Sequence, residues 1–372
     1  MSCPAGDTVI VVNLLVLGDR PPGGTGHYAI SLFEHMNSLI AAEGRPVRLI
    51  GVASAGAERY FSADVLPALR ILPSGSAWVR VINELWRLPR LARRERADIL
   101  FNPAFLGPAW GTPRRAVTVH DLYFRTVPRL VPRRRRWLLR LVTPLLARFS
   151  HVILTDSQAS LREIHDHYPG WAGRTRVVYC GSRLLGPRQD AGTATVRDPE
   201  PFVLIVGNLT PNKQPEVVIE AVRLLRDAGR TVRVVHVGDD HGRLEPAARR
   251  FGVVEQVQRL GRRTDDELAD LYRTCAAVIL PSLHEGFGLP LIEAQSLGAP
   301  VIASTRGALP EVAGDSARFF AVEDARSCAE AIADLLDDDV ARAALIDAGH
   351  RNAARFSWAH AARETLAALT AD

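Results

Sequence analysis

The sequence has few cysteines, a single lysine and no long hydrophobic run, and two of these absences exclude classes of protein. Its four cysteines, Cys3, Cys180, Cys275 and Cys328, are scattered and form no C-x-x-C pair, so neither a disulfide framework nor a zinc site is predicted. The chain shows no run of about 18 apolar residues and no charged-then-apolar leader. These absences predict a chain of the reducing cytoplasm that neither spans a membrane nor carries a secretion signal.

Length and charge predict two domains of different character. The 372 residues, 47% of them hydrophobic, suffice for two α/β domains of ordinary size. Residues 1–200 contain 27 Arg and 16 acidic residues, a balance of +11, whereas residues 201–372 contain 19 Lys plus Arg and 25 acidic residues, a balance of −6; together they give the formal +5. A basic half fits nucleic acid, an anionic membrane surface or a phosphorylated ligand.

A glycine loop that follows an apolar run at residues 277–280 carries the most chemical information. The run is typical of a strand buried on both faces, and Leu289-Pro290 predicts the start of a helix because proline suits the first helical position. Between them, Gly286 and Gly288 leave main-chain N–H groups accessible at a helix N-terminus. Such a site suits a phosphate or sugar hydroxyls.

Two glutamates, Glu285 and Glu293, lie eight residues apart in this stretch, so both can face one cleft. The alternative is that Glu285 caps the helix and Glu293 is a solvated helix residue. A loop at the carboxyl end of a buried strand favours ligand binding, since open α/β sheets bind ligands there. The order of residues from Glu285 through Gly286, Phe287 and Gly288 to Glu293 resembles the E-x7-E signature of family-4 retaining glycosyltransferases. The resemblance implies the GT-B fold, an α/β architecture of two Rossmann-like domains facing a deep cleft.

The N-terminal segment predicts a strand, a glycine turn and a helix. A strand is expected at residues 8–17 and a helix from about residue 27 to residue 42. Gly24-x-Gly26-x-x-Ala29 satisfies the dinucleotide fingerprint and raises a dehydrogenase as an alternative, but no acidic residue ends the next strand to bind a ribose 2′-OH. In the resembled family a glycine pair here lets the main chain approach the donor diphosphate. Gly23 and Gly24 fill that position, and a tight turn alone is the other interpretation.

Four further strands are expected in the first domain, with helical segments between them, and this alternation predicts a parallel sheet. They are residues 98–101, 116–119, 151–154 and 176–179. His120 and Asp121 follow one of these strands. The resemblance implies that His120 lies against the donor sugar and the acceptor, whereas a purely structural histidine is the alternative. Asp121 is expected to orient the loop, and Asp156 and Ser157 to cap a helix.

A second strand, loop and helix unit begins at residue 202, after a Gly- and Pro-rich linker at residues 186–201. Its loop contains Lys213, the only lysine of the chain beside 45 arginines. A compact ammonium at this position can pair with diphosphate oxygens, and a solvated lysine is the alternative. The family commonly has Arg directly after the loop glycine, where this chain has Asn208. The G-x-L-x-P-x-K form of the loop resembles that of bacterial mannosyltransferases, which favours GDP-mannose as the donor.

The rest of the second domain carries three local signals. Thr264 and Glu267 form a predicted capping box. Arg262 matches the family position at which main-chain groups meet the nucleobase. Ser357 is expected to cap a last helix, which in the resembled family crosses back to the first domain. The expected domains are therefore residues 1–188, acceptor-side and joined by 357–372, and residues 189–356, which bind the donor.

The combined prediction is a retaining glycosyltransferase that transfers a sugar, with mannose from GDP-mannose favoured, to a hydroxyl of a glycan or lipid-linked acceptor. No Asp-x-Asp pair stands in a suitable loop, so neither a metal nor a cofactor besides the nucleotide-sugar substrate is expected. The predicted catalytic residues are His120, Lys213 and Glu285. The predicted donor-binding residues are Gly23, Gly24, Asn208, Lys213, Arg262, Glu285, Gly286, Phe287, Gly288, Leu289 and Glu293.

Within this site Lys213 and the loop amides would stabilise the departing diphosphate, Glu285 would bind donor-sugar hydroxyls and Glu293 the ribose. Front-face substitution, with the leaving phosphate as base, is what the resemblance implies. Two other classes stay open: a GT-B sugar-nucleotide epimerase or glycoside-cleaving enzyme, and a non-catalytic basic binding protein.

The arginine-rich stretch at residues 133–149 predicts an amphipathic basic helix. Its apolar residues at helical spacing are Trp137, Leu138, Leu141, Leu145 and Leu146. Its arginines cluster at the start as Arg133, Arg134, Arg135 and Arg136. Burial of the apolar side chains in the core, with solvated arginines, is one interpretation; the favoured one is docking of the arginines on an anionic membrane at the inner face of the cell membrane. Nucleic acid is disfavoured because no aromatic stacking platform accompanies the charge.

Overall fold

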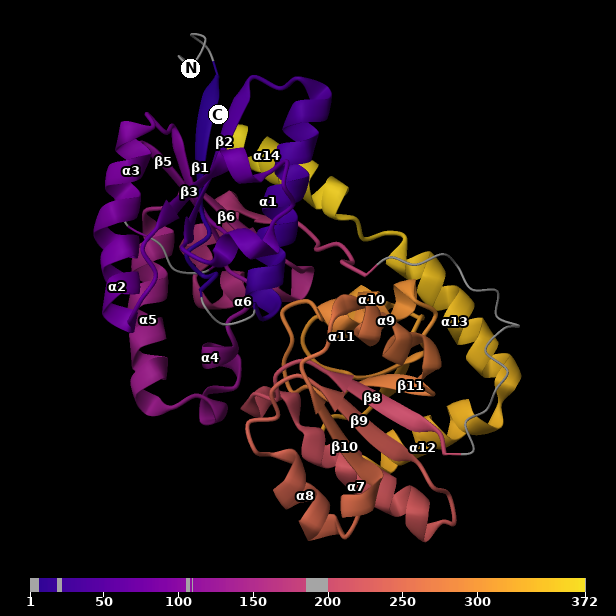
Figure 1. The fold of residues 1–372 in the computed structure, drawn as a ribbon. Coiled ribbons are helices and arrows are strands. Elements are labelled where there is room, and N and C mark those ends of the chain that lie inside the picture. The colour runs from indigo at the N-terminus through magenta and orange to yellow at the C-terminus, as the bar shows by residue number, and fades with distance from the viewer. Residues whose placement is uncertain (1–6, 19–21, 105–107, 109, 185–199, 372) are drawn as a thin grey trace. The chain divides into compact units, whose positions relative to one another are not determined.

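The computed structural model describes residues 7–18, 22–104, 108, 110–184 and 200–371, and the chain divides into two compact units (Figure 1). The first unit comprises residues 1–125, 132–181 and 357–372, and the second comprises residues 126–131 and 182–356. Each unit contains a parallel sheet with helices packed on it. This confirms the predicted α/β architecture of two Rossmann-like domains. Most of the expected linker, and the expected boundary between residues 188 and 189, lie outside the described residues.

In its described part, the first unit holds a seven-stranded sheet in the order β3-β2-β1-β4-β5-β6-β7. The strands are β1 (Thr8–Asn13), β2 (Val47–Ser54), β3 (Leu69–Leu72), β4 (Ile99–Asn102), β5 (Arg114–Thr118), β6 (Val152–Thr155) and β7 (Thr175–Val177). The main helical segments are α1 (Gly24–Glu43), α2 (Ala77–Ile82), η3 (Asn83–Arg87), α3 (Leu88–Arg94), α4 (Tyr123–Thr126), α5 (Arg133–Arg148), α6 (Gln158–His167) and α14 (Trp358–Thr370). The strand order reverses between β1 and β4, and open α/β sheets bind ligands at the carboxyl ends of the strands where such a reversal occurs.

The first strand is shorter than the sequence predicts. β1 ends at Asn13, whose side chain accepts a hydrogen bond from the Leu15 amide (3.1 Å) and donates one to Asn102 (3.1 Å). The expected extension to residue 17 is wrong because Leu14, Leu15 and Leu17 are buried in a turn and not in the sheet. The apolar residues after Asn13 therefore indicate that the loop at the carboxyl edge is buried, and they do not indicate pairing of this segment with a neighbouring strand.

In its described part, the second unit holds a six-stranded parallel sheet in the order β10-β9-β8-β11-β12-β13. The strands are β8 (Phe202–Val206), β9 (Arg233–Val237), β10 (Val257–Gly261), β11 (Ala277–Leu280), β12 (Val301–Ser304) and β13 (Arg318–Phe320). The helices are α7 (Pro215–Asp227), α8 (Leu244–Phe251), α9 (Asp265–Thr274), α10 (Leu289–Ser296), α11 (Leu309–Ala313), α12 (Ala325–Asp337) and α13 (Asp339–Ala353). The order reverses between β8 and β11, the two strands that precede the Lys213 and Glu285 loops.

The predicted N-cap of α9 is confirmed in full, and that of α14 is confirmed only in position. The Thr264 hydroxyl accepts from the Glu267 amide while the Glu267 carboxylate accepts from the Thr264 amide, which confirms the capping box of α9. Ser357 occupies the N-cap position of α14, but its side chain makes no capping hydrogen bond, so that prediction is right in position and wrong in mechanism.

The last helix returns to the first unit, as expected. α14 packs along α1, and the Trp358 ring lies edge-on to Tyr28 with 5.7 Å between ring centroids. Gly181, the last residue before the chain enters the second unit, lies against the start of α14; a Cβ there would sit 2.2 Å from the Trp358 amide nitrogen. The two connections therefore leave the first unit side by side.

Among the described residues no helix is long and apolar enough to cross a membrane.

Candidate functional site

The Lys213 ammonium and the Glu285 carboxylate form an ion pair in the second unit. Lys213 ends the short η6 helix (Pro211–Lys213) after β8, and Glu285 stands in the loop after β11. Glu285 also accepts a hydrogen bond from the Ser282 hydroxyl (2.6 Å). The side chains are only 23% and 12% exposed, so the lysine is not the solvated residue that the sequence left as an alternative. An ammonium has three donors, and one suffices for Glu285.

Neighbouring loops fix the position of Glu285. Asn212 receives a hydrogen bond from the Leu283 amide (2.7 Å) and donates one from its side chain to the His284 carbonyl (3.0 Å), which joins the β8 and β11 loops. The Ala308 amide donates to the Glu285 carbonyl (2.9 Å). Gly307 makes this approach possible: its φ is +61°, and a Cβ would lie 2.6 Å from the Glu285 nitrogen.

The glycine loop ends at the N-terminus of α10. Gly288 is the N-cap with φ +97°, and the helix starts at Leu289 as predicted, although Pro290 occupies its second position and not its first. Phe287 is 4% exposed and its ring packs edge-on against Phe356 (5.5 Å between centroids). The Phe287 ring is therefore part of the interior, and this residue can offer a ligand only its main chain. No side chain caps α10, so its first amides have no side-chain cap of their own.

Glu293 is buried in the second turn of α10, at 7% exposure, which rules out the solvated helix residue. Its Oε2 accepts a hydrogen bond from the Tyr272 hydroxyl (3.1 Å), and its Oε1 lies 3.8 Å from Nε of Arg183. Arg183 also pairs with Asp265 at 2.5 Å. Burial raises the pKa of Glu293 to about 7, although Arg183 and the Tyr272 hydrogen bond act in the opposite direction.

Arg183 and Tyr272 are site residues that the sequence analysis did not select. Arg183 lies near the start of the second unit, 110 positions before Glu293 in the chain, and Tyr272 lies on the inner face of α9. The Tyr272 ring is fully buried, and burial raises the pKa of its hydroxyl well above the usual value, so it stays a hydrogen-bond donor. The amphipathic period of α9, which puts Tyr272 on the apolar face with Leu268, is a sequence signal that could have found Tyr272. No local pattern marks Arg183.

Asn208 and Arg262 lie at the same edge of the sheet as Lys213. The Asn208 side-chain oxygen accepts from the Asp239 amide (3.2 Å), which ties the β8 loop to the β9 loop. Asn208 thus has a structural contact in the position where the resembled family carries an arginine. Arg262 is exposed just after β10, and β9 and β8 separate that strand from β11.

In the first unit His120 uses both ring nitrogens. Its Nδ1 lies 2.5 Å from Oδ2 of Asp156, and its Nε2 lies 3.0 Å from the Pro103 carbonyl oxygen. Burial by itself lowers the pKa of His120, but the charge and hydrogen bond of Asp156 raise it above the usual value. An imidazolium donates at both nitrogens, which suits a carboxylate on one side and a carbonyl on the other.

Asp156 was expected to cap a helix, and that prediction is wrong because its carboxylate pairs with His120 instead. Ser157 does cap α6, accepting from the Ser160 amide (3.0 Å). The Asp121 side chain accepts from the Tyr123 amide (3.1 Å), in agreement with the loop-orienting role expected for it.

Gly23 and Gly24 begin α1 in the first unit. Gly23 is the N-cap, and a Cβ on Gly24 would meet nothing within 4 Å. Gly26 is the crowded position, where a Cβ would lie 2.6 Å from Cβ of Pro22. The tight turn therefore depends on Gly26, which leaves the open Gly23-Gly24 pair accessible for a ligand's approach.

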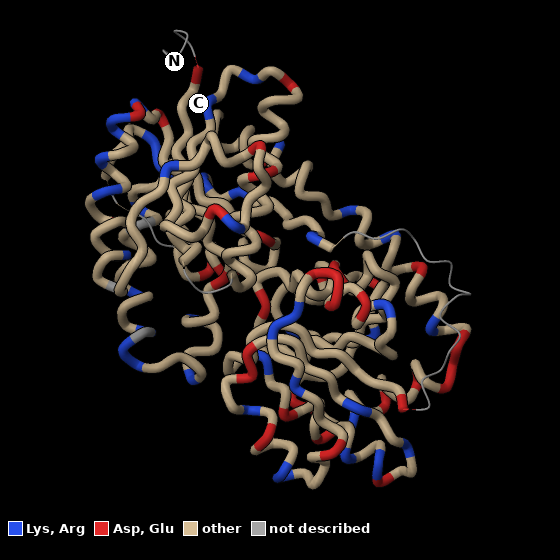
Figure 2. Tube along the Cα trace, in the orientation of Figure 1, with Lys and Arg blue, Asp and Glu red and all other residues tan. Residues whose placement is uncertain are grey.

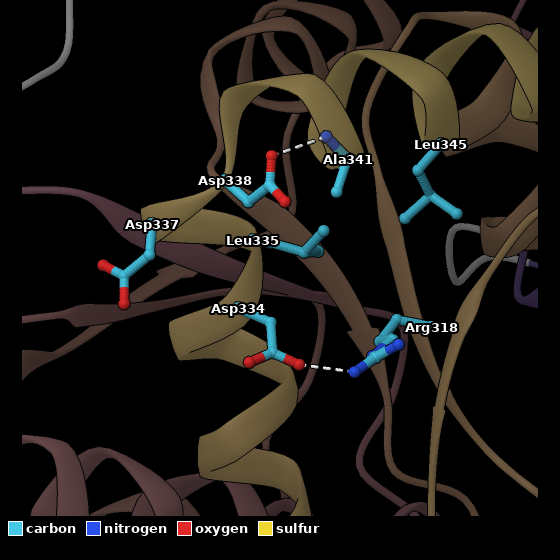
Figure 3. Close-up of a pocket in the computed structure, with 7 residues that line it drawn as sticks. All are labelled: Arg318, Asp334, Leu335, Asp337, Asp338, Ala341 and Leu345. Atoms are coloured by element: carbon cyan, nitrogen blue, oxygen red, sulfur yellow. Dashed lines mark hydrogen bonds and ion pairs between the residues drawn. The ribbon is translucent and has the colours of Figure 1, made fainter.

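One hollow of about 340 Å³ lies elsewhere in the second unit (Figure 3). It is lined by Arg318, Asp334, Leu335, Asp337, Asp338, Ala341 and Leu345. Arg318 starts β13 and pairs with Asp334 at 2.5 Å. The hollow is thus at the amino edge of the sheet, opposite the carboxyl edge that carries Lys213 and Glu285.

Comparison with known proteins gives matches over both units. Residues 22–183 match the family model described as Glycosyltransferase Family 4, and residues 190–352 match that of Glycosyl transferases group 1. The chain is 32% identical over 231 residues to the D-inositol 3-phosphate glycosyltransferase of Corynebacterium glutamicum (strain R), covering 57% of this chain and 55% of that protein. It is 36% identical over 237 residues to the protein of the same name from Nocardia farcinica, covering 59% and 52%. The chain spans about half the length of these curated relatives.

Solved structures of similar fold cover nearly the whole chain. Sucrose-phosphate synthase from Thermosynechococcus elongatus superposes with a TM-score of 0.76 at 19% identity, covering 96% of this chain and 97% of that one. Anabaena Alr3699/HepE in complex with UDP-glucose superposes with a TM-score of 0.73 at 18% identity, covering 97% and 100%. At such identities these structures speak for the fold alone.

Proposed function

We infer that this chain, whose two parallel-sheet units form the GT-B fold, belongs to the family-4 glycosyltransferases and transfers a sugar from a nucleoside diphosphate donor to an acceptor hydroxyl. Two family models support this, since they match the two halves of the chain in turn. The observation that carries the site is the Lys213–Glu285 pair at the N-terminus of α10, on the loops that flank the strand-order reversal.

The chemistry of the second-unit loops suits departure of a diphosphate. Cleavage of the sugar–phosphate bond develops negative charge on the phosphate, which the Lys213 ammonium and the amides from Gly286 to Leu289 would stabilise. Glu285 would accept hydrogen bonds from donor-sugar hydroxyls, and Glu293 from the ribose hydroxyls. With cationic and amide donors for the leaving group, the proposed reaction proceeds without a metal. Retention follows if the leaving phosphate itself deprotonates the acceptor on the face it leaves.

His120 is proposed to act by position and charge. Because Asp156 and the Pro103 carbonyl engage both nitrogens, it does not serve as a general base in the arrangement observed. The proposed role is to fix the loop after β5, next to which the donor sugar and acceptor are expected to bind.

We propose a specific donor and acceptor from the loop sequence and from the names of the relatives. The G-x-L-x-P-x-K loop that ends in Lys213 favours GDP-mannose, and a glycan or lipid-linked hydroxyl is the proposed acceptor. The relatives are named for D-inositol 3-phosphate, so inositol phosphate is the first soluble acceptor to test. We also propose that the enzyme works peripherally on the inner face of the cell membrane, with Arg133, Arg134, Arg135 and Arg136 toward anionic lipid.

The test is nucleotide release from GDP-mannose, UDP-glucose and related donors, with inositol phosphate, with a membrane-lipid extract and with neither. A transferase should release nucleotide quickly only when an acceptor is present. Rapid turnover of donor without any acceptor would indicate an epimerase or a glycoside-cleaving enzyme. No release from any donor under any condition would favour the non-catalytic binding protein.

A further inference from the structure

The helical run from residue 77 to residue 94 turns an apolar stripe toward solvent. Its exposed residues are Trp78 (77% exposed), Val81 (42%), Ile82 (45%), Leu85 (45%) and Trp86 (53%). Their spacing is i, i+3, i+4, i+7 and i+8, the pattern by which a helix normally faces the core. Nothing in the sequence distinguished this run, because its periodicity is that of an ordinary buried helix.

The α5 helix has the same inverted arrangement. Trp137, Leu138, Leu141 and Leu145 are 61%, 60%, 68% and 53% exposed. Its inward face instead carries small residues, with Thr143 and Ala147 buried. The alternative interpretation, burial of the apolar stripe in the core, is therefore wrong for these four side chains. The side chains of Arg135 and Leu146 lie outside what the structure describes.

The two stripes belong to one face of the first sheet. α2, η3 and α3 connect β3 to β4, and α5 connects β5 to β6; both crossovers run in the same direction across the sheet order. Right-handed crossovers in one direction place their helices on the same face. Figure 1 agrees, since it draws α2, α3 and α5 on one side of the sheet and α1 and α14 on the other. Leu88 of α3 packs in the core with strand residues of β1, β2 and β4, which fixes this run to the sheet.

The charge on these elements is one-sided. α5 contains six arginines and no acidic residue. Residues 77–94 contain five arginines and one acid, Glu84, which is paired with Arg80. Figure 2 shows basic segments along α3 and α5. The Arg90 guanidinium lies over the Trp86 ring at 5.1 Å, so cation and aromatic ring share one patch.

We propose that the exposed apolar residues of α2–η3 and of α5 together insert into the interfacial region of an anionic membrane. This extends the proposed membrane contact of Arg133–Arg136 from charge attraction to burial of aromatic and aliphatic side chains. Tryptophan and arginine are the side chains that favour this interface, the first by its amphipathic ring and the second by lipid phosphate.

The charge argues against the other occupants. A second copy of the chain, docked through the same face, would set two arginine-rich surfaces against each other. A nucleic acid would satisfy the arginines but would leave Leu138 and Leu141 against phosphate. Only an anionic lipid surface matches both the basic and the apolar parts of this face.

Vesicle binding without any donor tests the proposal independently of the transferase activity. The full chain should bind vesicles of phosphatidylglycerol and phosphatidylcholine at least tenfold more tightly than phosphatidylcholine alone, and part of the binding should persist at high salt. Brominated acyl chains should quench its tryptophan fluorescence. The double variant Trp78→Ser/Trp86→Ser and the variant Leu138→Gln/Leu141→Gln should each lose at least tenfold in affinity.

A matched control is Val340→Ser, which changes the 81% exposed Val340 of the second unit. It should bind vesicles like the unmodified chain, and all variants should melt at the same temperature because the changed residues are exposed. Full loss of binding at high salt, or unchanged affinity of the two double variants, would overturn insertion. Concentration-dependent dimers that both double variants abolish, without vesicle binding, would assign the face to a second copy. Because nucleotide release is measured separately with inositol phosphate, failure here leaves the transferase assignment standing, and the reverse also holds.

Discussion

Lys213, which pairs with Glu285, is proposed to stabilise the leaving phosphate. If the lysine acts mainly on the phosphate charge that develops in the transition state, Lys213→Ala should lower kcat by about 10²–10³-fold and change donor binding much less. Steady-state kinetics together with nucleotide titration would separate the two effects. Lys213→Arg is the control for charge without a compact head group. Near-normal kcat in Lys213→Ala would remove the phosphate assignment.

Glu293 should behave in the opposite way. Glu293→Ala should mainly weaken nucleotide binding and leave the turnover of bound donor nearly unchanged, since ribose contacts are made in ground state and transition state alike. A titration with nucleoside diphosphate alone measures this directly. A loss confined to kcat would contradict the ribose role.

The raised pKa of Glu293 predicts that nucleotide binding depends on pH. The pKa of Glu293 is raised from 4.5 to about 7, so its carboxylate forms across neutral pH. Ribose hydroxyls donate to the ionised form, and nucleotide affinity should therefore rise as pH increases through about 7. Because the folded protein holds this proton more tightly than the unfolded chain, the group's contribution to stability falls over the same rise, from about pH 4.5 to about 7.

The Arg183 cation lowers the pKa of Glu293, so Arg183→Gln should move the midpoint of the affinity profile to higher pH. Isothermal titration of nucleotide between about pH 5.5 and about pH 9 would measure the midpoint, because this range extends to both sides of the pKa of about 7 for Glu293. Arg273→Gln is the control, since Arg273 pairs with Asp270 on α9 at 2.9 Å. An unchanged midpoint in Arg183→Gln would mean that Arg183 is only structural.

At the scale of elements, the loop after β12 supports the loop after β11. Gly307→Ala should place a Cβ against the Glu285 backbone and force φ of +61° on alanine, which we expect to cost about 1–3 kcal/mol and to reduce donor binding. Gly229→Ala is the matched control, because Gly229 has φ of +80° and nothing within 4 Å of its Cβ position. Denaturant unfolding and nucleotide titration separate strain from displacement of Glu285. Equal effects of the two variants would leave only backbone strain.

Elements with strong local signals were predictable, and pairings across the chain were not. The strand at 277–280, the start of α10 and the capping box of α9 follow from apolar runs, proline position and side-chain spacing. β3 was not expected, because it is a four-residue strand at the sheet edge in which only Leu69 is buried, too short to show a clear period. The contacts of Asp156 with His120 and of Arg183 with Glu293 depend on strand order, which periodicity does not report.

The exposed stripes on α2–η3 and α5 show a further limit of patterns. An amphipathic period indicates that one helix face is apolar, but it does not say whether protein or another phase covers that face. For Trp78 and Trp137 only the fold decides: Leu88 on one helical run packs in the core with the sheet, Ala147 on the other is buried, and both tryptophans are exposed.

At the scale of the whole chain, the first unit is assembled from segments at both ends of the sequence. Residues 357–372 complete it. Trp358, in this C-terminal segment, is only 4% exposed and lies between Tyr28 and the backbone at Gly181. The first unit thus depends on chain made after the second unit is complete. Most of the proposed nucleotide-binding residues, Lys213, Glu285 and Glu293 among them, belong instead to the second unit.

This arrangement predicts that the two units respond separately to one substitution. Trp358→Ala should cost the first unit about 3–5 kcal/mol, since it removes a buried ring from a packed site. Trp137→Ala, a change at 61% exposure, should stay within about 0.5 kcal/mol. Calorimetry with and without nucleoside diphosphate would assign the transitions, because a ligand raises the melting temperature only of the unit that binds it. In Trp358→Ala the nucleotide-insensitive transition should move down while nucleotide affinity stays unchanged. A single transition that shifts as a whole would show instead that the two units unfold as one cooperative body.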